Sequence, residues 1–359
     1  MKAALIITGS EIITGKRQDA IVQPFAVKLL AKGIPVAEVR MLGDSPADLS
    51  ETVAGIKADL VIVTGGLGET PDDTTRKAVA VIPGIQDMNP IDNPVGSAKG
   101  IDLKFPDKRV VFCPGVPREA YAMIDTILSG MPDATLPTVN IPVFGMREQE
   151  IAKQIGMLAE RCGYLPKDME ITVVAPVELE KQIRDILGMH ALEEADLSTT
   201  VGRLLESKRL RFATAESCTG GLIGHLITYV PGSSKYFLGS VTAYSNDVKT
   251  CVLGVPADML AEYGAVSEQV ADAMLTGILK LTGAEIGVAT TGIAGPGGGT
   301  ADKPVGTVWI AAGTVDERVI RKFNFWFDRP GNKLISAKVA LYMLRSFIYD
   351  KGIHSSAFA

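Results

Sequence analysis

Histidine is scarce in this 359-residue sequence, and its scarcity narrows the chemistry that the chain can perform. Only three histidines occur, which is too few for a histidine-rich metal site. His190 falls in a polar connecting stretch and His354 near the C-terminus. His225 lies about two turns into the helix expected after Ser217, so its ring should point away from that serine. A nucleophilic Ser217 would therefore need a lysine or a carboxylate as its base.

The four cysteines are scattered and form no C-x-x-C pair, which argues against both a zinc site and a disulfide framework. They are Cys113, Cys162, Cys218 and Cys251. Cys218 directly follows Ser217, so a thiol nucleophile is an alternative at this point. A small buried side chain is the more ordinary role for each of the four.

Long apolar runs and runs of like charge are also missing. No uninterrupted apolar segment approaches the ~20 residues of a membrane span, and residues 3–7 are too short for the apolar core of a signal peptide. The formal net charge is −5 and no long run of like charges occurs, which disfavours a broad nucleic-acid footprint. We expect a cytoplasmic protein that binds neither nucleic acid nor membranes. We also expect it to form a homodimer.

The length of the chain suits about two domains of ~150 residues each. In the first, segments typical of buried strands alternate with segments typical of helices, which predicts a doubly wound α/β sheet. The expected strands are 5–7, 36–41, 59–64 and 110–112. Helices are expected at 21–31 and from Ser45, Thr74 and Arg118 onward, with Ser45 as an N-cap.

Three loops follow these strands, at 9–11, 65–73 and 114–118, where ligands bind in such sheets. Their glycines allow phosphates to approach the backbone, and nearby carboxylates could hold a hydrated divalent cation. Alternatively, the glycines only shape turns and the aspartates cap helices, because G-G-x-G alone is a weak signal. The candidate residues of this nucleotide or metal site are Glu11, Asp44, Gly65, Gly66, Gly68, Thr70, Asp72 and Asp73.

Prolines recur in the next stretch, where only short elements are expected. They are one helix from Glu148 to Glu160, a strand at 170–174 and a helix at 177–187. This length suits a small α+β connector rather than a third full domain. The predicted division is 1–137 for the nucleotide-binding domain, 138–195 for the connector and 196–359 for a second α/β domain.

The last domain should open with a helix at 197–208 and a strand near Phe212. Ser217 follows this strand, and apolar residues at helical spacing follow Ser217, with Gly220 and Gly221 between them. A serine at a strand-to-helix turn has unpaired backbone N–H groups beside it, which suit a phosphate or an oxyanion. The plainer interpretation is a serine that caps the helix.

Later segments add polar residues that follow strands. A strand at 241–244 leads through a turn at 245–247 to Lys249, and a strand at 286–290 opens into the glycine-rich loop 291–299. Ser267 is expected to cap a helix. A strand at 305–312, alternating phenylalanines at 323–327 and an amphipathic helix from Leu334 to Ile348 complete the domain.

Together these segments closely resemble the C-terminal domain of the CinA family, the nicotinamide-nucleotide amidases, over nearly all of residues 197–350. The matching motifs are Ala215-Glu216-Ser217-Cys218-Thr219-Gly220-Gly221, Pro231-Gly232-Ser233-Ser234, Tyr244-Ser245-Asn246 with Lys249, Gly264-Ala265-Val266-Ser267, Thr291-Gly292-Ile293-Ala294-Gly295-Pro296 and Pro304-Val305-Gly306-Thr307-Val308. The first domain resembles the family's molybdopterin-binding-like domain through Gly9-Ser10-Glu11, Gly65-Gly66-Leu67-Gly68, Thr70-Pro71-Asp72-Asp73 and Pro114-Gly115-Val116-Pro117. Phe144-Gly145 resembles the start of the family's connecting domain.

The resemblance implies an amidohydrolase of pyridine-nucleotide salvage, which converts nicotinamide mononucleotide to nicotinate mononucleotide and ammonia without a cofactor at this site. It implies Ser217 as the nucleophile and Lys249 as the general base, with Tyr244 relaying or orienting the proton. Backbone N–H groups near Thr219 and Gly220 would form the oxyanion hole. The implied substrate-binding residues are Thr219, Gly220, Gly221, Thr291, Gly292, Ala294, Gly295 and Arg329, the last for the phosphate.

For the first domain, the resemblance implies metal-dependent hydrolysis of ADP-ribose, with Mg²⁺ or Co²⁺ as the cation. The family's Asp-Thr-Asn is replaced here by Asp19-Ala20-Ile21, and the isoleucine removes a ligand contact. We therefore expect nucleotide binding with weak or absent pyrophosphatase activity. Two alternatives to the amidase stay open: a pyrophosphatase whose C-terminal domain is secondary, and a non-enzymatic nucleotide- or pterin-binding regulator, as the family's link with competence suggests.

Overall fold

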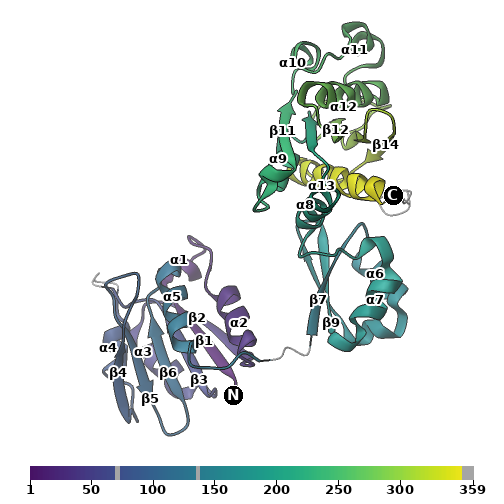
Figure 1. Cartoon of the computed structure of the whole chain (residues 1–359). Coiled ribbons are helices and arrows are strands. Elements are labelled where there is room, and N and C mark those ends of the chain that lie inside the picture. Colours follow the sequence, from purple (N-terminus) through teal and green to yellow (C-terminus); the bar gives the residue numbers. More distant parts are fainter. Residues whose placement is uncertain (69–72, 135–137, 350–359) are drawn as a thin grey trace. The chain divides into compact units, whose positions relative to one another are not determined.

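The chain separates into two compact units, Met1–Pro137 and Thr138–Ala359 (Figure 1). The structure is a computed structural model, and it describes residues 1–68, 73–134 and 138–349. None of the helices in these ranges is both long and apolar enough to cross a membrane.

The first unit is built on a six-stranded sheet in the order β2-β1-β3-β6-β5-β4. Its four parallel strands are β1 (Ala3–Thr8), β2 (Val36–Leu42), β3 (Leu60–Thr64) and β6 (Arg109–Cys113). The helices are α1 (Ser10–Ile13), α2 (Val22–Ala31), α3 (Pro46–Gly55), α4 (Thr75–Val79) and α5 (Pro117–Leu128). Ser45 caps α3 as predicted, because its Oγ accepts from the Asp48 N–H at 3.3 Å.

Alternate residues of β1 enter different cores, which confirms the predicted doubly wound sheet. Leu5 and Ile7 pack in the core that contains α2 and α5, whereas Ala4 and Ile6 pack in the core that contains α3 and α4. Every residue of β1 and β3 except Thr8 and Thr64 is apolar, and all of them are buried. This is the pattern that helices on both faces of a parallel sheet require.

Two strands of this sheet were not predicted from the sequence. The hairpin of β4 (Asp87–Ile91) and β5 (Gly100–Lys104) extends the sheet in the antiparallel sense beyond β6. β4 has the sequence DMNPI and is almost wholly exposed. Its proline and polar residues are tolerated because it is an edge strand, and they hide the alternation that would mark it.

The second unit begins with a three-stranded antiparallel sheet in the order β7-β9-β8. The strands are β7 (Thr138–Phe144), β8 (Gly163–Lys167) and β9 (Glu170–Pro176). The helices α6 (Glu148–Ile155) and α7 (Glu180–Leu187) pack side by side against it (Figure 1). The predicted helix from Glu148 to Glu160 is wrong beyond Ile155, because Gly156 has a φ of 60° and a 3-10 segment follows it.

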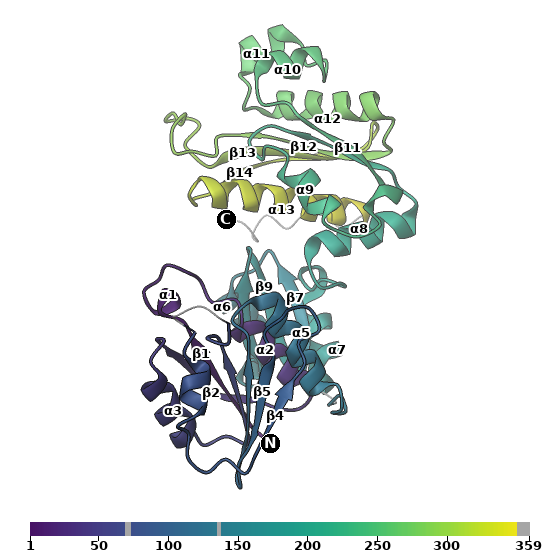
Figure 2. The same ribbon diagram turned by 90° about the vertical axis from the view of Figure 1, so that its left-hand side faces the viewer.

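The rest of this unit is a five-stranded sheet in the order β11-β10-β12-β13-β14. Its parallel strands are β10 (Phe212–Glu216), β11 (Phe237–Thr242) and β12 (Ile286–Gly292), and β13 (Thr307–Gly313) and β14 (Arg318–Asn324) are antiparallel. Figure 2 shows α8 (Leu197–Lys208), α9 (Leu222–Thr228) and α13 (Arg329–Ile348) on one face and α12 (Glu268–Thr282) on the other. The short helices α10 (Asn246–Cys251) and α11 (Ala257–Tyr263) lie beyond α12.

The last helix differs from its prediction in both start and character. It begins at Arg329 rather than Leu334, with Asp328 as the N-cap. It is not amphipathic, since nearly every residue from Asn332 to Ser346 is buried. The helix packs on the sheet and also contacts the 138–195 segment, where Lys338 pairs with Glu170 at 2.5 Å. Burial on most sides therefore replaces the single apolar face that the sequence suggested.

Candidate active site

Ser217 stands directly after β10, at the carboxyl end of this strand, which pairs with β11 and β12. Its N–H donates to the Thr290 carbonyl on the neighbouring strand at 2.9 Å, and the residue is 8% exposed. The plainer interpretation, in which Ser217 caps the next helix, is wrong, because α9 starts only at Leu222. Gly220 and Gly221 separate the two with φ values of 64° and 90°, which are left-handed conformations that glycine adopts readily.

Glu216, and not Ser217, caps the N-terminus of α9. Its buried carboxylate accepts the N–H groups of Ile223 at 3.0 Å and Gly224 at 2.8 Å, in the first turn of α9. It also accepts the hydroxyls of Thr214 at 3.0 Å and Ser240 at 3.1 Å. A negative charge at a helix N-terminus is stabilised by the free N–H groups and the helix dipole. Glu216 thereby fixes both ends of the loop that carries Ser217.

The side chain of Lys249 reaches Ser217. It lies in α10, whose start is capped by Ser245, and it is only 1% exposed. Its Nζ atom is 3.1 Å from Ser217 Oγ, and it donates to the carbonyls of Ala243 at 2.8 Å and Tyr244 at 3.4 Å. Burial away from water lowers the pKa of Lys249, because the charged form loses its hydration.

Cys218 is the other nucleophile that the sequence left open. Its thiol is buried, and burial raises its pKa to about 12. Only a thiolate is a strong sulfur nucleophile, and at neutral pH a thiol with this pKa stays protonated. The geometry therefore favours Ser217, whose hydroxyl meets a basic nitrogen.

A cavity of about 270 Å³ opens beside Ser217 and Lys249. The predicted residues Tyr244, Thr291, Gly292, Ala294, Gly295 and Arg329 all line it. Asn246, Ala265, Val266, Ile293, Gly297 and Gly298 also line it and were missed as site residues. No aspartate or glutamate is among the described lining residues, whereas lysine and arginine are both present. The cavity is therefore suited to an anionic ligand.

Tyr244 and Arg329 form one side of this cavity. The Tyr244 residue is 61% exposed, and its hydroxyl accepts from Arg329 Nη2 at 2.9 Å, while Arg329 Nη1 donates to the Gly295 carbonyl at 2.6 Å. Only the backbone carbonyl of Tyr244 contacts Lys249. In the described part of the chain no hydrogen bond joins the Tyr244 hydroxyl to Ser217 or Lys249, so the structure gives no proton relay through it.

Thr219 and Gly220 support the loop that carries Ser217 and do not line the cavity. Thr219 Oγ1 is 2.8 Å from Thr290 Oγ1, and the Gly220 N–H donates to the Ser217 carbonyl at 3.1 Å. The Gly220 N–H is therefore engaged already, and neither Thr219 nor Gly220 lines the cavity, so the structure does not support either residue as an oxyanion donor. Thr291 does line the cavity, but its hydroxyl donates to the Ala265 carbonyl at 2.6 Å.

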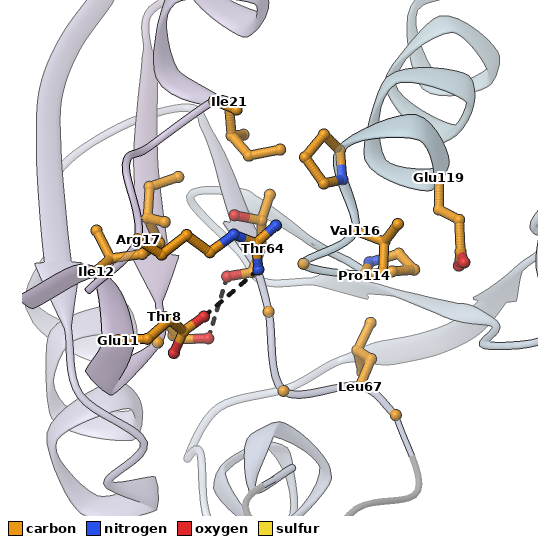
Figure 3. A pocket seen from close by; sticks show the side chains of 18 of the residues that line it. Thr8, Glu11, Ile12, Arg17, Ile21, Thr64, Leu67, Pro114, Val116 and Glu119 are labelled. Carbon is orange, nitrogen blue, oxygen red and sulfur yellow. Dashed lines mark hydrogen bonds and ion pairs between the residues drawn. The ribbon is translucent and has the colours of Figure 1, made fainter. Parts of the chain in front are cut away.

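A second cavity, of about 370 Å³, lies in the first unit at the carboxyl ends of β1, β3 and β6 (Figure 3). Gly65 and Gly66 line it with φ values of 110° and 63°. A Cβ atom at Gly65 would lie 2.3 Å from Thr8 Oγ1, and one at Gly66 would lie 2.5 Å from Thr75 Oγ1. These two glycines are therefore required by the turn itself, as the plainer interpretation held.

The carboxylates near this cavity already have partners. Glu11 pairs with Arg17 at 3.6 Å, which Figure 3 shows beside Thr8 and Thr64, and Asp44 accepts the Ser10 N–H at 3.0 Å. Gly68 and Asp73 line the cavity, while the candidates Thr70 and Asp72 lie outside the described residues. Among the residues that are described, no three metal-ligating side chains come together. Their placement does not fit a divalent cation held by protein ligands alone.

Comparisons with known proteins cover both units. The family described as "CinA C-terminal domain" matches residues 194–348, and the family described as "Probable molybdopterin binding domain" matches residues 4–134. A Desulforudis audaxviator protein named for induction by competence damage is 35% identical, with 97% of this chain and 99% of that protein aligned. A "CinA-like protein" of Thermotoga maritima is 34% identical, over 97% of this chain and 98% of its own length. A solved structure of a CinA superfamily protein from Klebsiella pneumoniae is 34% identical over 43% of this chain and 96% of its own, with a TM-score of 0.42.

Proposed function

The chain belongs to the CinA family, and we propose that its C-terminal domain hydrolyses the carboxamide of nicotinamide mononucleotide. The products are nicotinate mononucleotide and ammonia. The observation that carries the proposal is the contact of 3.1 Å between Lys249 Nζ and Ser217 Oγ, inside a cavity without acidic lining residues among those described. A serine activated by a buried lysine is a recognised arrangement for acyl transfer from amides and esters.

In the first half of the reaction, neutral Lys249 takes the proton from Ser217 as Oγ attacks the carboxamide carbon. The tetrahedral intermediate places its negative charge on the former carbonyl oxygen. As the intermediate collapses, the C–N bond breaks and Lys249 returns the proton to the leaving nitrogen. Ammonia departs, and the acyl group of the nucleotide remains on Ser217 as an ester.

In the second half, a water molecule replaces ammonia beside the ester. Lys249 removes a proton from this water, the resulting hydroxide attacks the acyl carbon, and the bond to Oγ breaks. The proton held by Lys249 passes to Ser217, which restores the serine and the neutral lysine. The net reaction consumes one water and releases one carboxylate and one ammonia, which is protonated in solution.

Arg329 supports the choice of an anionic amide as substrate. Its guanidinium group lines the cavity and is held by the Gly295 carbonyl and the Tyr244 hydroxyl, so its position is fixed before substrate binds. Arginine pairs well with phosphate oxygens because its N–H groups match them in pairs. In this proposal Arg329 holds the nucleotide phosphate, and Tyr244 orients Arg329 rather than relaying a proton.

The test is ammonia release from nicotinamide mononucleotide by the full chain and by Ser217→Ala. We expect the substitution to lower kcat by more than about 10³-fold, since it removes the nucleophile. Ser207→Ala is a matched control, because Ser207 is an exposed serine on α8 whose hydroxyl only bonds the Leu204 carbonyl. Equal rates for wild type and Ser217→Ala would refute the proposal.

A second proposal concerns the cavity of the first unit, which lies where α/β sheets bind nucleotides. We expect ADP-ribose to bind there, with little pyrophosphatase activity, because the described carboxylates are engaged elsewhere. Equilibrium dialysis with ADP-ribose would detect binding, and Gly66→Ala should weaken it by crowding Thr75. Hydrolysis of ADP-ribose with Mg²⁺ or Co²⁺ at rates similar to the amidase reaction would contradict this expectation.

A further inference from the structure

Asn332 lies in the first turn of α13 and is 1% exposed. All three hydrogen bonds of its side-chain amide go to backbone atoms. Oδ1 accepts the Phe327 N–H at 3.1 Å, while Nδ2 donates to the Phe327 carbonyl at 2.9 Å and to the Ala294 carbonyl at 3.1 Å. The amide thus joins two segments that are distant in the sequence.

Both segments matter for the cavity beside Ser217. Ala294 belongs to the cavity wall after β12, and Phe327 immediately precedes the turn that places Arg329. The next carbonyl along the wall, that of Gly295, accepts from Arg329 Nη1 at 2.6 Å. The first turn of α13 therefore holds two consecutive carbonyls of the wall, one through Asn332 and one through Arg329.

We propose that Asn332 is a positioning residue for the amidase reaction: it fixes the Ala294–Gly295 wall and Arg329 relative to Ser217. This inference rests on the proposed function. Asn332 is buried behind the wall and does not line the cavity, so it acts through the residues that it holds. A displacement of the wall by about 1 Å would misplace the amide carbon relative to Ser217, which can lower a rate about 10²-fold.

The chemistry of the site requires an amide. Among neutral side chains of this size, asparagine alone supplies two N–H donors and a carbonyl acceptor. Aspartate has the same shape but, when ionised, only accepts, so it would face the carbonyls of Ala294 and Phe327 without a proton to share. Leucine has a similar volume but no polar atom, so it leaves the Phe327 N–H, the Phe327 carbonyl and the Ala294 carbonyl without the hydrogen bonds that Asn332 supplies.

The experiment measures ammonia release from nicotinamide mononucleotide by the full chain carrying Asn332→Asp or Asn332→Leu. We expect kcat/KM per folded molecule to fall about 10²-fold in both at pH 8. Ser336→Ala is the matched control, because Ser336 is buried one turn further along α13 and donates only to the Asn332 carbonyl at 2.5 Å. Its kcat/KM should stay within about twofold of wild type, as expected for a change that leaves the wall in place.

The pH profile separates positioning from a general loss of stability. In Asn332→Asp the introduced carboxyl group regains one donor when it is protonated, and burial favours this neutral form. The ratio of Asn332→Asp to wild-type kcat/KM should therefore rise as the pH is lowered from 8 to 6, while the ratio for Asn332→Leu stays flat. Flat ratios for both variants, or activity per folded molecule equal to wild type, would overturn the inference.

Hydrogen exchange of the peptide that spans 291–299 gives a readout that needs no turnover. The positioning role predicts faster exchange there in Asn332→Leu than in wild type and Ser336→Ala. If wild type released no ammonia, the proposed function would fail on its own, and this comparison would still decide whether Asn332 holds the wall. Unchanged exchange in Asn332→Leu would refute the positioning role.

Discussion

The Nζ atom of Lys249 lies 3.1 Å from Oγ of Ser217, and both residues are nearly closed off from solvent. Within the described residues, the other hydrogen bonds of Nζ go to the backbone carbonyls of Ala243 and Tyr244, which bear no full charge, and no carboxylate pairs with it. A lysine without a carboxylate partner in a buried setting loses its proton more easily than one in water. This relationship makes Lys249 the base of the proposed reaction.

The pH dependence of ammonia release should follow the protonation of Lys249. Only its neutral form accepts the serine proton, so kcat/KM should rise with pH through the lowered pKa of Lys249 and then level off below pH 10.5, the ordinary value. Lys249→Ala should lower kcat/KM by about 10²- to 10⁴-fold and abolish this acidic limb. If the residual kcat/KM of Lys249→Ala still rose with pH as in wild type, the titrating group would be one other than Lys249.

Removal of the Lys249 side-chain amine should raise stability although it removes the base that activity needs. Because its pKa is lower in the folded chain than in the unfolded chain, the unfolded chain binds more protons between these two values, and stability rises with pH there. Below the folded-state pKa the full cost of burying the charge is present. Lys249→Met should therefore stabilise the protein by about 0.5–2 kcal/mol at neutral pH. Thermal unfolding of wild type and Lys249→Met at pH 7 and pH 10 should show a smaller difference in stability at the higher pH.

Glu216 should be essential for the loop that carries Ser217. Glu216→Gln turns one acceptor oxygen into a donor that faces other donors, and we expect a loss of about 1–3 kcal/mol in the free energy of unfolding. Chemical denaturation measures this, and kcat should fall as well because Ser217 is the next residue. Thr214→Val removes one bond to the same carboxylate and the contact with Ser240 Oγ at 2.8 Å, but leaves the N–H groups of α9 with their acceptor, and should cost less. A Glu216→Gln protein as stable and active as wild type would exclude the capping role.

Cys218 should prove dispensable as a nucleophile. Its pKa of about 12 keeps the thiol protonated at neutral pH, so iodoacetamide should modify exposed Cys251 first and leave the amidase active. Cys218→Ala should retain ammonia release within about tenfold, since only a small buried side chain is lost. Rapid inactivation that correlates with labelling of Cys218, found by peptide mass analysis, would argue for a thiol mechanism.

The buried pair of Lys338 and Glu170 should hold α13 to the 138–195 segment. Burial raises the pKa of Glu170 and the neighbouring ammonium group opposes that rise, so the pair depends on both members. Lys338→Met alone should cost about 3–5 kcal/mol, because it leaves a buried carboxylate uncompensated. The double variant with Glu170→Leu should recover much of that loss. Thermal unfolding of Lys338→Met and of the double variant would measure this recovery, and equal stability of the two would contradict it.

The sequence was sufficient where local patterns decide the structure. Apolar runs located β1 and β3, and Ser45 and Ser267 marked the starts of helices that they do cap. The sequence was insufficient where tertiary packing determines the structure. The exposed strand β4 lacks alternation, and α13 is buried on most sides because it lies against two layers.

The candidate site shows the same limit. Periodicity gave no reason to join Ser217 and Lys249, which lie on different elements, and only resemblance to a family paired them. The capping role of Glu216 had a signal, an acidic residue shortly before a glycine turn and a helix, but Ser217 was the more obvious cap. No pattern in the sequence indicated the hydrogen bonds of Asn332, because they connect segments that meet only in the folded chain.

The most direct test of the central claim is rapid-quench mass analysis of the full chain mixed with nicotinamide mononucleotide. The account predicts an acyl adduct, with the mass of the substrate less ammonia, on the peptide that contains Ser217, formed at the rate of the first ammonia release. The adduct should be absent in Ser217→Ala and should accumulate little in Lys249→Ala. Ammonia release by wild type without an adduct at Ser217, together with turnover by Ser217→Ala, would contradict the account.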